Sequence, residues 1–518
     1  MPRVNIREID NTGSDTRSYI ENIALLPALK LEGYDEDDNL ITVDGTYTTL
    51  ASFEAQVKKV LKTREIEWID PEGEPDKYKA ERAAVQNLNN IKDVFIQDKG
   101  YAMAHILLSY GLPIDYKGVY NLIVTYLESG DYATVTPNIQ ELEGKEVIKN
   151  LYTEYSDKGK YDGKFILPPY IDLDKTVTTT DRTVTPNKII RSIEERFIIN
   201  VDERAMQCAG NRGDSYALIY SPNYLKGSTE INKWIQENFN EIATTLIPRP
   251  AVSWAVNETT EQYGSYGTHY RSNIIVPRYK ITSPYTYSLD GGESGDYVKV
   301  DYTFINATFP GYLYYLLCYV TNTKTTPDWF AISGAVRGSG PFAIRLIEQF
   351  GDADIDLFQP RSASGEIDNY GNDKNLNHIA TNGICNIRPY GNIVWGNRTM
   401  HPLNVPANGS SEEIQLVASD FLNIRSLCCD LKKTIYRAAR RYTFDPNSDE
   451  LWFNFKSAVT PLLEKMKSNQ GIRDYQFIKI ATRKKALFAA KIIITPIEAV
   501  EDFDITVQLD DSIEVGQN

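Results

Sequence analysis

Residues 216–239, YALIYSPNYLKGSTEINKWIQENF, decide the fold class of this chain. The first five, Tyr216–Tyr220, predict a buried strand, because a short apolar run closed by turn residues is typical of one. A capped helix then follows to about Leu246, with apolar residues at the spacing of a core-facing stripe. Another strand is predicted at Ile274–Val276. Strand–helix–strand order indicates an α/β body, here of mixed α/β and α+β type.

Downstream, the last hundred residues predict a helix pair and a hairpin. Ser419 or Asp420 caps the first helix, and a capping box at Asn447 starts the second. Strands Tyr475–Ala481 and Leu487–Thr495 form the hairpin. This region therefore reads as a unit of its own.

Before the last hundred residues, the patterns of apolar and polar residues are less regular. Tyr101–Leu108 and, further on, Gly311–Val320 are apolar on all sides, which predicts buried helices. Residues 127–195 are polar and weakly patterned, so we expect loops and an excursion on the surface.

Both ends of the chain carry short strands without an evident partner. Phe503–Leu509 alternates apolar and polar residues, and Val4–Arg7 is a shorter version. A lone strand leaves its backbone groups unpaired, so it must pair within the domain as an ordinary edge strand or pair with another subunit. In the second case the protein is a building block of a polymer. The predicted arm contacts are Val4, Ile6, Ile9, Phe503, Ile505, Val507 and Leu509.

Composition narrows the class of protein. The chain has 518 residues, 42% of them hydrophobic, and a net charge of −15, which argues against direct binding to nucleic acid. No apolar run reaches the ~18–20 residues that span a bilayer, so no stable membrane insertion is expected. The N-terminus shows no signal peptide, which indicates synthesis and retention in the cytoplasm. Five cysteines without CxxC spacing indicate reduced thiols.

The motifs of catalysis are missing. The sequence has no GxSxG elbow, HExxH pair, P-loop or CxxC pair. Gly338-Ser339-Gly340 begins a fragment like a dinucleotide fingerprint, but Pro341 follows and a turn fits better. Asp35–Asp38 lacks the glycine and the distant glutamate of a calcium loop. We therefore predict no catalytic residue, metal or cofactor.

One helix carries a dense basic stripe. Residues 421–442 hold six basic residues against one acidic residue. Lys433, Arg437, Arg440 and Arg441 lie at i, i+4, i+7 and i+8, on one face. A solvated face is the plain alternative. In so acidic a chain, a stripe of this density favours an acidic partner.

Several segments, in order, resemble contractile tail sheath proteins of phages and related injection machines. They are Ile6–Asp10, the Cys208–Asp214 turn with its strand, Asp328–Gly338, the block Asn382–Thr399 with Trp-Gly-Asn-Arg-Thr, and the Phe444–Ser448 turn. Ile332 and Ser333 depart from the family's usual Pro and Ala. Residues 20–200 match only loosely. The motif positions are Arg212, Asp214, Trp329, Arg337, Gly338, Trp395, Gly396, Arg398 and Thr399.

The resemblance implies a multi-domain, non-enzymatic subunit of a virion tail sheath, assembled in the host bacterial cytoplasm. Its partners would be further copies of itself, the tail tube protein, and the baseplate and tail terminator proteins. The basic stripe would face the tube. A non-contractile shell or baseplate component and an α/β enzyme are the alternatives. The implied parts are an N-terminal arm (1–20), an N-terminal α/β portion (21–200), a central core (201–418), a tube-facing helix pair with hairpin (419–499) and a C-terminal arm (500–518).

Overall fold

The structure is a computed structural model, and it describes ten stretches of the chain. They are residues 22–61, 98–126, 133–137, 147–170, 201–220, 268–270, 274–288, 297–346, 382–399 and 417–499, without 36, 203, 342 and 482–486. The arm contacts Val4, Ile6, Ile9, Phe503, Ile505, Val507 and Leu509 lie outside these residues, as does the helix predicted to Leu246.

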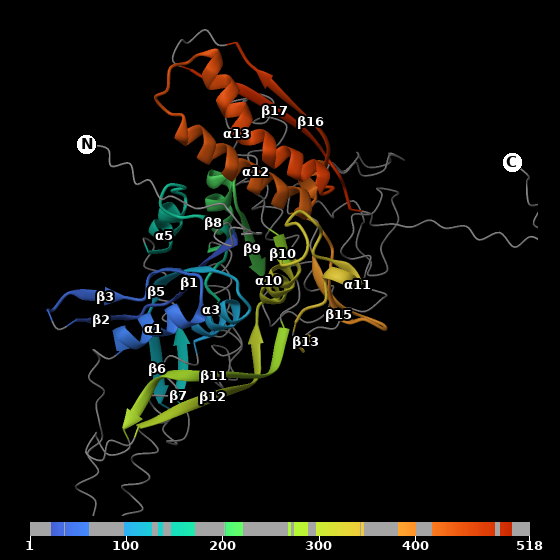
Figure 1. The fold of residues 1–518 in the computed structure, drawn as a ribbon. Coiled ribbons are helices and arrows are strands. Elements are labelled where there is room, and N and C mark those ends of the chain that lie inside the picture. The colour runs from blue at the N-terminus through green and yellow to red at the C-terminus, as the bar shows by residue number, and fades with distance from the viewer. Residues whose placement is uncertain are drawn as a thin grey trace, which may run out of the picture.

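A mixed six-stranded sheet forms the centre of the molecule and confirms the α/β class (Figure 1). Its first five strands pair in parallel and β4 pairs antiparallel with β5. In spatial order the strands are β10 (Thr268–Tyr270), β9 (Tyr216–Tyr220), β8 (Gly163–Ile166), β1 (Ile23–Leu29), β5 (Ile114–Tyr120) and β4 (Gly45–Tyr47).

The expectation of surface loops over residues 127–195 is wrong in one part. β8 lies inside the sheet with every residue buried, and α5 (Val147–Tyr155) packs with Ile148 and Leu151 in the core. A four-residue strand is too short to leave a periodic signal. The sheet also takes strands from both sides of residue 200, so 21–200 and 201–418 share one hydrophobic core.

Helices cover this sheet. α3 (Lys99–Ser109) contacts β1, α10 (Gly311–Asn322) contacts β9, and α1 (Leu50–Leu61) packs beside α3. The predictions of buried helices are confirmed, because Tyr101 to Leu108 and Gly311 to Val320 are all buried. Asp98 caps α3 by accepting a hydrogen bond from Tyr101 N at 2.7 Å.

Smaller sheets and one short helix surround the centre. They are β2 (Glu32–Tyr34) with β3 (Leu40–Thr42), β6 (Leu122–Tyr126) with β7 (Ala133–Pro137), the long ribbon β11 (Ile274–Ser288) and β12 (Tyr297–Phe309) with β13 (Arg345–Leu346), α11 (Gly334–Arg337), and β14 (Gly383–Ile387) with β15 (Gly391–Trp395).

The C-terminal unit stands at one end of the molecule (Figure 1). It comprises a short 3₁₀ turn (Ala418–Asp420), α12 (Leu422–Arg441), α13 (Asp449–Ser468), β16 (Ile472–Lys479) and β17 (Ala490–Pro496). A second, smaller core joins its helices and hairpin through residues such as Leu427, Val459 and Met466.

Two caps in this unit differ from the prediction. Phe421, not Ser419 or Asp420, occupies the N-cap of α12, because the preceding residues form the 3₁₀ turn. Ser448, not Asn447, caps α13, and its hydroxyl accepts from Leu451 N at 3.2 Å. Of the described helices, none combines the length and apolar character needed to cross a membrane.

Candidate functional site

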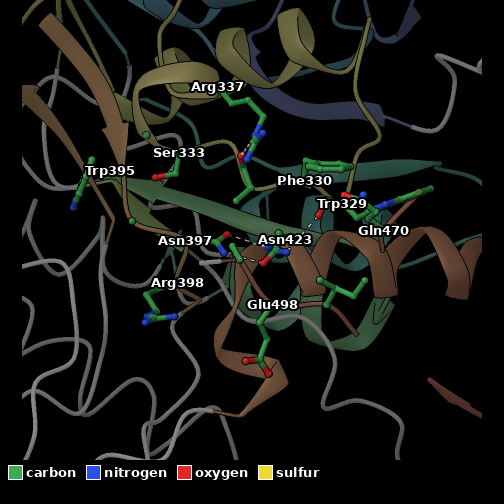
Figure 2. Close-up of a pocket in the computed structure, with 15 residues that line it drawn as sticks. Trp329, Phe330, Ser333, Arg337, Trp395, Asn397, Arg398, Asn423, Gln470 and Glu498 are labelled. Atoms are coloured by element: carbon green, nitrogen blue, oxygen red, sulfur yellow. Dashed lines mark hydrogen bonds between the residues drawn. The ribbon is translucent and has the colours of Figure 1, made fainter. Parts of the chain in front are cut away.

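A cavity of about 420 Å³ lies where the C-terminal unit meets the core, and Figure 2 shows its lining. We call it the arm-root pocket, because Ala499, the last described residue before the C-terminal arm, lines it. It brings together five motif positions from two separate segments: Trp329, Arg337, Trp395, Gly396 and Arg398. The remaining lining residues are Phe330, Ala331, Ser333, Gly334, Asn397, Asn423, Gln470, Ile497, Glu498 and Ala499.

The first motif segment builds one wall. Arg337 donates from Nε to the carbonyl of Ala331 at 2.7 Å, and its guanidinium lies 5.3 Å from the centre of the Phe330 ring. Gly338 ends this segment in close contact with β15, since an added Cβ would lie 2.6 Å from the carbonyl oxygen of Val394. The glycine therefore lets α11 sit directly on β15.

The second motif segment joins β15 to the start of α12. Asn382 holds Arg398 from both sides: its Nδ2 donates to the Arg398 carbonyl at 2.7 Å and its Oδ1 accepts from Arg398 N at 2.8 Å. Arg398 is buried, with its guanidinium 4.6 Å from the centre of the Phe421 ring. Thr399 N donates to the Asp420 carbonyl at 2.8 Å. The contacts of Arg398 and Thr399 therefore fix the start of α12.

Three asparagines connect the second motif segment to its neighbours by hydrogen bonds, and the sequence analysis did not select them as site residues. Besides Asn382, Asn397 donates from Nδ2 to Asn423 Oδ1 at 2.8 Å, and Asn423 N donates to Asn397 Oδ1 at 3.1 Å (Figure 2). Single asparagines have no spacing that would mark them beforehand. The neighbouring Gly396 has a positive φ of 98°, and an added Cβ there would lie 2.7 Å from Asn382 Oδ1. A glycine at this position is the one local feature that indicates the close contact with Asn382.

The root of the C-terminal arm is fixed to the pocket wall. Ile497 N donates to the Gly471 carbonyl at 3.1 Å, and Trp329 Nε1 donates to the Asn469 carbonyl at 3.1 Å. Gly471 packs so tightly on Trp329 that an added Cβ would lie 2.7 Å from Nε1. The chain therefore leaves the body at a defined place.

The Arg-Gly-Asp turn lies elsewhere and is buried. Arg212 donates to the Tyr155 carbonyl at 2.6 Å, and its Nε lies 3.1 Å from Asp214 Oδ1. Arg425 of α12 donates to the Gly213 carbonyl at 2.7 Å. This buried turn therefore anchors α12 to the core.

The basic stripe is divided by the structure. Lys433 is 3% exposed and its Nζ lies 3.1 Å from Asp162 Oδ1, so the expectation that it lies on an open face is wrong. Arg437 pairs with the same carboxylate. Burial acts to raise the pKa of Asp162, but attraction to these two cations lowers it below its ordinary value. Arg440 and Arg441 are exposed.

A buried ionic cluster, which sequence reasoning missed, lies below α12. Lys164 is fully buried, and its Nζ lies 3.0 Å from Asp430 Oδ1 and 3.7 Å from Asp328 Oδ2. Nζ also donates to the hydroxyl of Tyr319 at 3.0 Å. That hydroxyl donates to Asn22 Oδ1 at 3.0 Å, and Asn22 Nδ2 donates to Asp328 at 3.1 Å. We call these five residues the Lys164 cluster.

Two carboxylates share one ammonium in the Lys164 cluster, so ionising both is unfavourable. Burial, followed by the neighbouring Asp328, raises the pKa of Asp430 to about 6 in spite of Lys164. Burial acts to lower the pKa of Lys164, but the two carboxylates outweigh it and raise that pKa. The cluster joins the start of β1, β8, α10, the motif segment and α12, so it fixes the C-terminal unit on the core.

Nothing among the described residues forms a group of three or more His, Cys, Asp and Glu side chains that could hold a metal. The thiols of Cys208, Cys318, Cys385 and Cys429 are buried. Burial raises the pKa of Cys208 to about 11 and raises that of Cys318 still further, which makes both poor nucleophiles. The arrangement suits packing and docking.

No protein-family model matches the chain, and no curated protein matches it. Several cryo-EM structures align over nearly the whole chain, and three of them are the following. A chain of the anti-feeding prophage baseplate has 10% identity and a TM-score of 0.47, covering 98% of this chain and 99% of that one. A sheath complex of an extracellular contractile injection system, PVC, in the contracted state has 12% identity and a TM-score of 0.46, covering 99% and 98%. The contracted helical sheath of the anti-feeding prophage has 12% and 0.43, covering 98% and 99%.

Proposed function

We propose that this chain is the structural subunit of a contractile tail sheath, which polymerises around an inner tube and contracts to drive it through a cell envelope. The proposal is supported above all by one observation: five sheath-like motif positions, far apart in sequence, meet around one pocket at the root of the C-terminal arm. Their polar groups bond to backbone and to neighbouring rings, which is a structural role.

The hairpin β16–β17 supports the polymer part of the proposal. In the described chain this sheet has two strands, and a two-stranded sheet is marginal alone. Strands of neighbouring subunits can extend it, Phe503–Leu509 at one end and Val4–Ile9 at the other. Four apolar residues at ~1.5–3 kcal/mol each, with hydrogen bonds at ~1 kcal/mol each, would hold neighbours together.

In this proposal contraction is a rotation of rigid subunit bodies, with the arms as hinges. Energy is stored in metastable packing during assembly, so neither nucleotide nor metal is required, and the chain is not an enzyme. The exposed Arg440 and Arg441 face an acidic tube. The five parts of the chain act as two arms, a shared α/β body and a tube-side unit. Further partners are the baseplate and terminator proteins, in a virion tail assembled in the bacterial cytoplasm.

Electron microscopy of the purified protein tests this function. Wild-type chains should form ribbed tubes, long before contraction and short after it. Deletion of residues 501–518 should leave folded monomers, by circular dichroism, that form no tubes. Normal tubes from the deleted chain would remove the arm from the proposal, and wild-type particles of any other shape would remove the sheath.

A further inference from the structure

The arm-root pocket has apolar walls, and the chain's own C-terminal arm begins at its rim. Trp329, Phe330 and Trp395 supply aromatic surface (Figure 2). Ala499 lines the same cavity. Nineteen residues, 500–518, follow Ala499, so a long piece of chain starts beside an apolar hollow.

The tether between pocket and arm is short. The bond from Ile497 N to the Gly471 carbonyl, 3.1 Å, fixes the root. Phe503 is the first large apolar residue after Val500 and stands four residues beyond Ala499. An extended chain covers at most about 3.3–3.6 Å per residue, so Phe503 can reach any point within roughly 13 Å of Ala499. That range is ample for a cavity of about 420 Å³ that Ala499 itself lines.

The arm and the pocket are complementary in charge. Arg337 and Arg398 line the pocket against a single carboxylate, Glu498. The arm carries Glu501, Asp502 and Asp504 around Phe503. An aromatic ring between carboxylates fits a pocket with aromatic walls and guanidinium groups.

We propose that, in the free subunit, the C-terminal arm folds back on its own body and places Phe503 in the arm-root pocket. A short tether gives an effective concentration in the millimolar range, so the pocket binds its own arm before that of another subunit. Growth of a polymer then supplies a competing partner strand and draws the arm out. This role as a brake on premature assembly rests on the proposed function, but the docking itself does not.

Disulfide cross-linking of dilute monomer tests the docking. The variant Ser333→Cys with Phe503→Cys is oxidised with diamide and analysed by non-reducing gel electrophoresis and peptide mass spectrometry. Ser333 lines the pocket. We expect most chains to carry an intramolecular 333–503 disulfide. The matched control is Val336→Cys with Phe503→Cys, because Val336 lies in α11, which begins directly after Ser333, but is 85% exposed and outside the lining. It should cross-link at least fivefold less.

Three results would overturn the docking: no cross-link, equal cross-linking in the control, or dimers whose yield rises with protein concentration. The last would assign the pocket to the arm of a second copy.

Acrylamide quenching of tryptophan fluorescence checks the result without new cysteines: Phe503→Ala should expose Trp329 and Trp395 and raise quenching, and Ile513→Ala should not. Chains that form ribbed tubes but show no 333–503 disulfide would refute the docking and leave the sheath function standing; the reverse result would separate the two in the other direction.

Discussion

The central sheet and the C-terminal sheet are built on opposite principles. All seven residues of β1 are buried, and so are all five of β9. In β16 and β17 burial alternates, and no residue of β17 is buried. Ile478, Ile480 and Ile493 are exposed in or beside these strands. These two inner strands of the central sheet are thus covered within one chain, whereas the hairpin exposes apolar surface that an added layer or strand can cover.

The difference shows where folding and assembly are encoded. The core is large and continuous, and the Lys164 cluster ties the C-terminal unit to it through Asp430 of α12. The C-terminal unit has a smaller core and an open strand pair. We therefore expect changes in the core to alter the free energy of unfolding, and changes on the hairpin to alter association.

The largest effect should come from Lys164→Met. This change leaves the buried Asp430 and the half-buried Asp328 without their ammonium partner, which lies 3.0 and 3.7 Å away in the wild type. Removing one partner of a buried ion pair costs about 3–5 kcal/mol. Urea unfolding followed by circular dichroism measures it. The control Lys160→Met removes an exposed ion pair with Glu154 and should cost less than about 1 kcal/mol. Equal losses in both variants would show that the cluster is not a special contact of the core.

The second effect is a pH dependence that originates in the same cluster. The folded pKa of Asp430, about 6, lies above its ordinary value of 3.8, so the folded state holds this proton more tightly. Its contribution to stability is complete below pH 3.8 and is lost as the pH rises through 6. With 1.36 kcal/mol per pKa unit, the loss is on the order of 3 kcal/mol.

Asp430→Asn isolates this contribution from other carboxyl groups. Asp162, whose pKa is lowered, acts in the opposite direction and gains stability as the pH rises. The difference in unfolding free energy between wild type and Asp430→Asn should therefore change between pH 4 and 7, with the wild type losing relative stability. A constant difference across that range would contradict the raised pKa.

How far the sequence predicts this molecule depends on whether the determining contacts are local. The buried helix Gly311–Val320 could be predicted because its apolar residues are continuous. Lys164 could not, since its partner Asp430 is 266 residues away and a lysine in a short strand reads as exposed. The motif positions could be recognised, but their meeting at the arm root required the fold.

A third, smaller effect concerns a helix cap within the C-terminal unit. Ser448→Ala removes the hydroxyl that accepts from Leu451 N at the start of α13, and should cost about 1 kcal/mol. Asn447→Ala, the cap that the sequence pattern favoured, should cost clearly less in the same urea titration. A larger loss at Asn447 would restore the capping box predicted from sequence.

The smallest effect on folding should accompany a loss of association. Ile478→Thr and Ile493→Thr change side chains that are already exposed, 41% and 38%, so little apolar burial is lost within the chain. Threonine retains β-branching, which keeps the strand conformation favourable. We expect the free energy of unfolding of each variant to stay within about 0.5 kcal/mol of the wild-type value, because surface substitutions rarely cost more.

If neighbouring subunits cover the hairpin, the double variant should lower the yield of tubes in sedimentation and electron microscopy. The matched change in the central sheet, Ile219→Thr on the fully buried β9, should instead unfold the subunit. Equal destabilisation of both sheets would show that the hairpin is covered within one chain, and the contrast between a complete and an incomplete sheet would disappear.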